Sequence, residues 1–378
     1  MNILIIHQSA ELYGSDKTML QLAGGLISRG CTVVVLLPND GPLKVSLQQL
    51  GVICVVGEVV KLNRGMMNFR GIMVMPFKLL KSISTIRRLV VRHEIDILHS
   101  NTLAVIGGCL YRSIFKIKHV WHVHEILADL KVINHLYGFL LRSYADEVIC
   151  NSNATKRYLI DISLSNERSK VIYNGIDLDV SESSKINSKR MVGFQEADLV
   201  VGLVGRINDW KGHDLMMDAF ESLDSRKRLK LLFVGSPPIG KDFYLDKLRR
   251  RIEISKVSEC IRLIGFQDDM ARIWKAIDIC VIPSIKPEPF GMVAIEAMAH
   301  SIPVIAADHG GVSEIVIDNY TGYKFTPNSA SSLACAIERL SDSVETISDF
   351  GRNSRARVCD NFPIMKYVNN IYDVYRDE

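Results

Sequence analysis

The sequence IDICVIPSIKPEPFGMVAIEAMAHSIPVIAADHGG, residues 277–311, decides the fold of this chain. It begins with an apolar run of branched side chains at 279–282, continues through a proline-rich loop, and enters a helical pattern at Gly291. A second apolar run follows at 302–307. Two strands that are apolar throughout, joined by a helix, predict a parallel pair covered on both faces.

The same alternation of strand-like and helical segments extends on both sides of residues 178–198, a stretch rich in Ser, Lys, Asn and Glu that interrupts it. Such alternation is typical of doubly wound α/β domains. We therefore predict two tandem doubly wound, Rossmann-like domains facing a cleft, 1–180 and 195–360. The apolar spacing of 361–378 predicts a further helix, and this spacing is compatible with packing on either of the two domains.

Composition excludes several classes of protein. With 378 residues, 48% of them apolar and 23% charged, the chain is long enough for two globular domains and is not a disordered sequence. Its longest run without a charged residue, 97–111, is too short for a membrane helix. The N-terminal MNILIIHQS resembles a strand more than a signal peptide. The eight isolated cysteines predict buried free thiols, and together these features predict a cytoplasmic protein.

Charge is unevenly distributed along the chain. The net charge is +8 over residues 1–190 and −4 over 191–378. Residues 59–93 hold eight bases and no acid, interleaved with Met, Phe and Leu. This segment is either an anionic-membrane surface or the solvated face of an amphipathic helix. Nucleic acid is not an expected partner, because the sequence pI is only about 8.5 and no nucleic-acid-binding module is present.

A phosphate site is predicted at the start of the helix within 277–311. Backbone N–H groups of Gly291, Met292 and Val293 point out of that helix start, where anions bind. Glu288 precedes the helix and Glu296 lies within it, so carboxylates flank the site. This arrangement suits a sugar nucleotide, whose hydroxyls the carboxylates would bind, although the spacing of the two acids alone is also met in structural roles.

Two cations follow the strand that opens the second domain, in VGRINDWKG. Arg206 and Lys211 could neutralise a diphosphate leaving group without a metal, or be solvated loop residues.

In the first domain, the strand HVWHVHE directs His122 and His124 to one side and Glu125 to the other. His124 is the better candidate for the cleft, and a zinc site is not expected because no third ligand cluster accompanies the two histidines. Gly14 and Ser15 would open a helix at the same edge.

With these motifs assembled, the chain resembles the retaining family 4 glycosyltransferases of the GT-B fold over nearly its whole length. VGRINDWKG, EPFGMVAIEAMA, PVIAADHGGVSEIV and YNGID are similar to motifs that occur in this order in the family. HVHE and ICNSNATK are similar to motifs of its acceptor domain. Two positions depart from the family pattern: Ser301 replaces a turn glycine, for which we expect a left-handed backbone, and YGSDK replaces the commoner Gly-Gly of the first loop.

The resemblance implies that the helix at 361–378 packs back on the first domain, and it implies roles for the residues identified above. Arg206 and Lys211 would hold the donor diphosphate, Glu288 the transferred sugar and Glu296 the ribose. His124 would line the reacting centre, with Glu125 beside it. The remaining donor contacts implied are Gly14, Ser15, Phe290, Gly291, Met292 and Val293.

We therefore expect a retaining hexosyltransferase that moves a sugar from a nucleoside-diphosphate donor to a lipid-linked or otherwise membrane-held glycan in envelope polysaccharide assembly. No cofactor and no divalent metal are expected. The protein would then lie on the inner face of the cytoplasmic membrane. The alternatives are a sugar-nucleotide epimerase or sugar phosphorylase of the same architecture, and a non-catalytic sugar-nucleotide-binding partner.

Overall fold

The structure is a computed structural model. It describes residues 1–12, 14–61, 69–127, 131–162, 164–178, 185–223, 228–267 and 269–377. Parts of the basic segment (62–68) and of the predicted linker (179–184) lie outside the described residues. The chain forms two compact units. They comprise Met1–Gly175 with Ile364–Glu378, and Ile176–Pro363.

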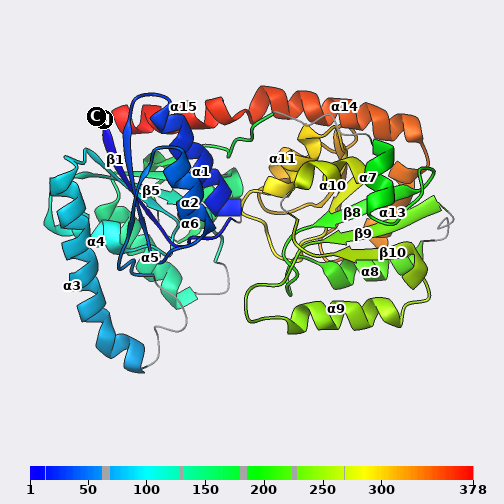
Figure 1. Ribbon diagram of the computed structural model, residues 1–378, viewed down its shortest axis with the longest axis horizontal. Helices are drawn as coiled ribbons and strands as arrows, with labels where there is room; N and C mark the ends of the chain where they lie inside the picture. Colours follow the sequence, from blue (N-terminus) through cyan, green and yellow to red (C-terminus); the bar gives the residue numbers. More distant parts are fainter. Residues whose placement is uncertain are drawn as a thin grey trace. The chain divides into compact units, whose positions relative to one another are not determined.

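Within its described residues, the first unit contains a seven-stranded parallel sheet in the order β3-β2-β1-β4-β5-β6-β7 (Figure 1). Its strands are β1 (Asn2–His7), β2 (Thr32–Leu37), β3 (Ile53–Val56), β4 (Ile97–Asn101), β5 (Lys118–Val123), β6 (Glu147–Cys150) and β7 (Ser169–Val171). Its helices are α1 (Gly14–Ile27), α2 (Pro42–Gln49), α3 (Phe69–Arg92), α4 (Gly107–Ile114), α5 (Lys131–Tyr144), α6 (Asn153–Asp161) and α15 (Ile364–Arg376).

Alternate residues of β1 explain why the sheet is covered on both faces. Ile3 and Ile5 pack in a cluster with residues of α1, α2 and α15. Leu4 and Ile6 point the other way, into a cluster with residues of α3 and α4. Because both sets are buried, the four central positions of the strand, Ile3 to Ile6, must all be apolar.

The second unit contains a six-stranded parallel sheet among its described residues, in the order β10-β9-β8-β11-β12-β13. Its strands are β8 (Leu199–Val204), β9 (Leu229–Val234), β10 (Ile261–Ile264), β11 (Ile279–Ile282), β12 (Val304–Ala307) and β13 (Gly322–Phe325). Its helices are α7 (Lys185–Met191), α8 (His213–Ser222), α9 (Phe243–Glu253), α10 (Met270–Ala276), α11 (Met292–Ala299), α12 (Val312–Ile315), α13 (Ala330–Ser341) and α14 (Val344–Asn361).

The fold class agrees with the sequence prediction of two doubly wound sheets, while several element bounds differ. The pattern of the sequence alone predicts a helix over 102–113, but α4 begins at Gly107, because Thr102 has a φ of 134° and cannot be helical. The predicted linker contains α7, in which Ser188 and Lys189 are buried. All eight cysteines are free, but Cys335 and Cys359 are exposed rather than buried.

The basic segment contains most of the long helix α3. Its inner face is set by Ser82, Ile86 and Leu89, which recur at helical spacing and are buried. Met73, Phe77 and Leu80 are exposed instead, with Phe77 at 74%. Among the described residues, no helix is long and apolar enough to cross a membrane.

Candidate active site

The two central strands of the second sheet end in the loops that carry the predicted donor residues. β8 and β11 are neighbours, and the strand order reverses between them. In parallel α/β sheets, ligands bind at such reversals, beyond the carboxyl ends of the strands. Lys211 comes from the loop after β8, and Glu288 comes from the loop after β11.

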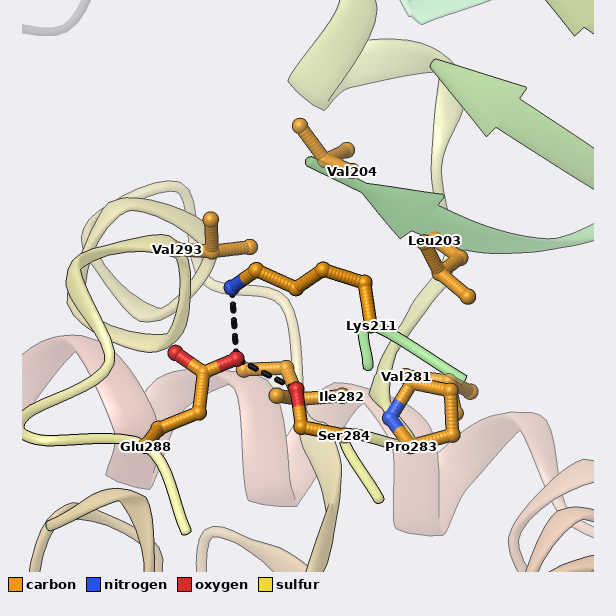
Figure 2. A pocket seen from close by; sticks show the side chains of 9 residues that line it. All are labelled: Leu203, Val204, Lys211, Val281, Ile282, Pro283, Ser284, Glu288 and Val293. Atoms are coloured by element: carbon orange, nitrogen blue, oxygen red, sulfur yellow. Dashed lines mark hydrogen bonds and ion pairs between the residues drawn. The ribbon is translucent and has the colours of Figure 1, made fainter. Parts of the chain in front are cut away.

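Lys211 and Glu288 meet in a small pocket between these loops (Figure 2). The Lys211 Nζ lies 2.6 Å from Oε1 of Glu288. The Ser284 hydroxyl donates to the same oxygen at 2.5 Å. Glu288 is 5% exposed, so its carboxylate is desolvated and needs both partners.

The loop after β8 is held in one conformation. The side-chain carbonyl of Asn208 accepts hydrogen bonds from the backbone N–H groups of Trp210 and Lys211, at 3.2 and 3.0 Å. Gly212 has a φ of 78°, and a Cβ there would lie 1.9 Å from the carbonyl oxygen of Pro283. Glycine is therefore required at 212 for the two loops to approach closely enough for Lys211 to reach Glu288.

Helix α11 starts at the edge of the same pocket. Gly291 is its N-cap with a φ of 114°, and Val293 lines the pocket. Phe290 is buried, and its ring packs edge-on against Phe362 at 6.0 Å. The start of α11 thus lies next to the Lys211–Glu288 pair, as predicted for a phosphate site.

Other predicted donor residues do not line this pocket. Met292 and Glu296 are half-buried on α11, outside the residues that line the pocket. Arg206 is exposed in the loop after β8 and also does not line the pocket. In the first unit, α1 begins at Gly14, which is exposed, and Ser15 is half-buried.

Three adjacent strands of the first sheet end in polar side chains. His7 and Asn101 close β1 and β4 and are paired in register, and His124 directly follows β5. The Asn101 Oδ1 lies 3.0 Å from His124 Nε2, and Asn101 Nδ2 lies 2.9 Å from His7 Nδ1. The Asp16 Oδ1 lies 2.7 Å from His7 Nε2. These groups form one buried hydrogen-bond network.

Burial controls protonation in this network. It lowers the pKa of His124 to about 3, with smaller contributions from the neighbouring His7 and His99. The His122 ring lies on the same side as His124, as alternation predicts, with ring centroids 4.0 Å apart. His124 is therefore neutral at physiological pH.

Glu125 follows His124 and turns back onto the backbone. Its Oε2 accepts hydrogen bonds from the N–H groups of Leu103 and His124, at 2.9 and 3.2 Å. Desolvation nevertheless raises its pKa to about 7. Among the described residues, no cluster of three or more His, Cys, Asp or Glu side chains could hold a metal ion.

Sequence reasoning missed several site residues. Ser284 and Asn208 position the Lys211–Glu288 pair, and His7, Asp16 and Asn101 support His124. For His7 and Asn101, the available signal was a polar side chain at the carboxyl end of a buried strand, in NILIIH and ILHSN.

Comparisons with known proteins agree with this architecture. Residues 184–357 match the family described as Glycosyl transferases group 1, and residues 13–180 match Glycosyltransferase Family 4. An uncharacterised glycosyltransferase of Methanocaldococcus jannaschii is 30% identical over 82% of this chain and 82% of its own length. A D-inositol 3-phosphate glycosyltransferase of Catenulispora acidiphila is 30% identical over 56% of this chain, which spans only 51% of that relative. A further glycosyltransferase of M. jannaschii, 30% identical over 65% of this chain, is matched over 64% of its length.

Solved structures extend the likeness over the whole chain. Anabaena HepE, solved in complex with UDP and glucose, superposes with a TM-score of 0.86 at 26% identity and covers 100% of both chains. A sucrose-phosphate synthase of Thermosynechococcus elongatus has a TM-score of 0.83 at 22% identity, over 100% of this chain and 98% of the synthase, and shows the fold alone.

Two doubly wound units, one with a cation–carboxylate pair beside a helix start, define a glycosyltransferase of the GT-B fold. This chain belongs to the family 4 glycosyltransferases, and its residues 184–357 match the family of group 1 glycosyl transferases.

Proposed function

We propose that this glycosyltransferase is a retaining enzyme that transfers a hexose from a nucleoside-diphosphate sugar to a lipid-linked or membrane-held glycan of an envelope polysaccharide. The observation that carries the donor part is the buried Lys211–Glu288 pair at the start of α11. The complexes of HepE with UDP, glucose and UDP-glucose support the same class of donor.

In this proposal the pair opens when the donor binds. Lys211 exchanges the Glu288 carboxylate for the diphosphate, and Glu288 is released to accept hydrogen bonds from sugar hydroxyls. Arg206 would bind the diphosphate from the solvent side, and Glu296 would bind the ribose. The N–H groups at the start of α11 supply further donors to phosphate without a metal ion.

The transfer breaks the bond between the anomeric carbon and the diphosphate oxygen, whose electron pair stays on the diphosphate. A bond from the acceptor oxygen to the anomeric carbon forms on the same face. The acceptor proton passes to the departing phosphate, so no side chain needs to act as base. Lys211 and Arg206 stabilise the charge on the leaving group, a contribution typically worth about a hundredfold in rate.

Helix α3 supplies the argument for a membrane-held acceptor. Exposed Met73, Phe77 and Leu80 lie on one segment with exposed Lys78 and Lys81, the combination that binds an anionic interface. Two findings reduce the charge available. Lys78 and Lys81 lie 4.0 and 3.9 Å from Glu58 carboxylate oxygens. Lys61 is directed inward, donating to the Gln8 carbonyl.

A metal-free assay tests the donor site. The protein is heated with UDP, GDP, dTDP, ADP or CMP, without and with Mg²⁺. We expect one diphosphate to raise the unfolding temperature in proportion to the logarithm of its concentration, without metal. Stabilisation that appears only with Mg²⁺, or with none of the nucleotides, contradicts the proposal. With the donor identified, a new glycosidic bond to the acceptor distinguishes this reaction from epimerisation, and a retained anomeric configuration in that product distinguishes retaining from inverting transfer.

Liposome flotation tests the acceptor surface. Recovery with anionic vesicles should fall when exposed Phe77 and Leu80 are replaced by Ser. The matched control replaces exposed Val344 of α14 in the second unit, and its recovery should not change. Equal recovery of both variants excludes α3 as the attachment site. A soluble acceptor, such as the inositol phosphate named for the Catenulispora relative, then becomes the better candidate.

A further inference from the structure

The network behind His124 has a fixed direction, which begins at Asp16. An ionised carboxylate can only accept hydrogen bonds. Because Asp16 Oδ1 lies 2.7 Å from His7 Nε2, that nitrogen must carry a proton. The Ser9 hydroxyl donates to the same carboxylate oxygen. In a neutral His7 ring, Nδ1 is then an acceptor.

This acceptor orients the amide of Asn101. The Nδ2 of Asn101 lies 2.9 Å from His7 Nδ1 and can only donate to it. The amide oxygen is therefore directed the opposite way, 3.0 Å from His124 Nε2. An oxygen accepts, so His124 must carry its proton on Nε2.

The same oxygen fixes a second histidine. His99 Nε2 lies 3.4 Å from Asn101 Oδ1 and donates to it as well. His99 Nδ1 is left as an acceptor, and the Tyr375 hydroxyl is 2.7 Å from it. The five bonds that join Asp16, His7, Asn101, His124, His99 and Tyr375 are thus satisfied by one assignment of protons, in which each of the three rings is neutral. In this assignment His7 Nδ1 accepts from the Asn101 amide at 2.9 Å and donates nothing to the Asn101 backbone carbonyl oxygen, which lies further away at 3.3 Å. Burial supports this assignment, since it lowers the pKa of His99 and His124 to about 3.

We propose that Asn101, oriented by the Asp16–His7 pair, is a positioning residue that holds His124 as the Nε2–H tautomer and so presents its Nδ1 as a hydrogen-bond acceptor to a substrate hydroxyl. His124 is the exposed end of the network at 9%, whereas His7, His99 and Asn101 are at most 1% exposed. A neutral acceptor selects hydroxyl groups, which sugars offer, and gives no attraction to phosphate. The role of His124 as an acceptor for a substrate hydroxyl rests on the proposed function, but the Nε2–H tautomer of His124 does not.

Nitrogen NMR of protein labelled with ¹⁵N-histidine tests the tautomer directly in the whole chain. Signals are assigned by substituting His7, His99 and His124 one at a time. At pH 7 we expect all three rings to be neutral, with a pyrrole-like Nε2 and a pyridine-like Nδ1. A proton on Nδ1 of His124, or a doubly protonated His7, overturns the proposal. This reading stays valid even if the protein transfers no sugar.

Two variants of Asn101 separate positioning from packing. Asn101→Asp keeps an acceptor oxygen and should keep the Nε2–H form of His124, whereas Asn101→Leu removes it and should give mixed tautomers. In a transfer assay, Asn101→Leu should lower kcat about tenfold or more with little change in donor KM, because Asn101 acts on the substrate only through the orientation of His124. Unchanged His124 signals in Asn101→Leu contradict the proposal.

Tyr375→Phe is the matched control. It removes an equally buried hydroxyl at the other end of the network, 2.7 Å from His99 Nδ1, without touching the bond from Asn101 to His124. The His124 signals and kcat should stay as in the unaltered protein. If Tyr375→Phe changes His124 as much as Asn101→Leu does, the effect of Asn101 is general loosening of the core, and the positioning role is wrong.

Discussion

The two sheets of this chain share a doubly wound topology, but the side chains at their strand ends differ in charge. The second sheet ends in a desolvated ion pair, with Lys211 and Glu288 2.6 Å apart. The first ends in buried neutral groups, with His7, Asn101 and His124 joined through hydrogen bonds. A charged pair can be exchanged for a charged ligand, whereas the neutral His124 ring at the exposed end of the network can only recognise dipoles. The electrostatic properties of each half therefore come from the few residues at its strand ends, not from the shared topology.

The largest expected difference between the two units is in how far acid lowers their free energy of unfolding. Burial lowers the pKa of His119 to about 4 and that of His122 well below its usual value, in addition to His99 and His124. Below pH 6.5 these histidines bind protons in the unfolded chain but stay neutral in the folded unit. The free energy of unfolding therefore falls as the pH falls. One histidine shifted to about 4 contributes on the order of 3 kcal/mol by pH 4.

Tryptophan fluorescence measures this acid effect. Trp121 lies in the first unit, and substituting Phe for Trp210 and Trp274 makes fluorescence report on that unit alone. We expect its denaturant midpoint to fall steeply between pH 6.5 and 4. Among its described residues, the second unit has histidines with a lowered pKa only at buried His213 and half-buried His300, and should lose less. A midpoint independent of pH would contradict the neutral state of the network. Replacing exposed His135 by Gln should change nothing.

Breaking the ion pair should have the next largest effect, on activity. Lys211→Ala removes the cation that would stabilise the leaving group, and it leaves the buried Glu288 carboxylate without its ion-pair partner. We therefore expect kcat to fall about a hundredfold to a thousandfold. Glu288→Gln should lower kcat while leaving nucleoside-diphosphate binding nearly intact, because the proposed contact of Glu288 is to the sugar. Initial rates and calorimetric titration of the nucleotide measure the two quantities.

Lys247→Ala is the control for this pair. Lys247 also pairs with a carboxylate of the second unit, Asp214, at 2.6 Å, but both side chains are more than half exposed. Its loss should leave activity unchanged, as is usual for exposed ion pairs. If Lys211→Ala is no worse than Lys247→Ala, the pocket is not the donor site.

Glu125, next to His124 in the first unit, should have a smaller effect, on the pH dependence of stability. Its pKa is raised from 4.5 to about 7 by desolvation. The stability it contributes is complete below pH 4.5 and is lost as the pH rises through 7. Glu125→Gln keeps the oxygen that accepts from Leu103, and should be more stable than the unaltered protein by about 2 kcal/mol at pH 8 but not at pH 4. Urea unfolding at both pH values measures this, and equal differences at the two would refute it.

The smallest expected effect concerns the turn after α11. Ser301 has a φ of 59°, a left-handed backbone that glycine adopts without strain. Ser301→Gly should stabilise the second unit by about 0.5–1 kcal/mol. Ser348→Gly, within α14 and exposed, should instead destabilise by a similar amount. Thermal unfolding compares the two variants, and a loss of stability at 301 would show that its hydroxyl is needed there.

The sequence predicted the elements that carry local patterns. Apolar strands, helix starts and the left-handed turn at Ser301 are encoded within a few residues, and the structure confirms them. Local patterns also placed Lys211 and Glu288 in loops after two strands whose ends were expected to face the same cleft. Their pairing with each other was not predicted, because it depends on Gly212 letting one loop lie against the carbonyl of Pro283.

The histidine network could not be predicted in the same way. His7, Asn101 and His124 are distant in sequence and become neighbours only through the strand order β1-β4-β5. A strand-end histidine or asparagine is ambiguous until its neighbour is known. The direction of the hydrogen bonds in the network depends in addition on a helix, because Asp16 on α1 determines which nitrogen of His7 carries the proton.

The chain enters and leaves the second unit at adjacent points. Ile176 pairs with Pro363, and its N–H donates to the carbonyl of Phe362 at 2.9 Å. The second unit is therefore a contiguous insert whose two ends lie side by side, while the first is completed only when α15 returns to it. A gene that joins residue 175 to residue 364 through a short linker should encode the histidine-bearing half alone. A plain truncation after residue 175 would lack the apolar side chains of α15 that cover α1, and should aggregate.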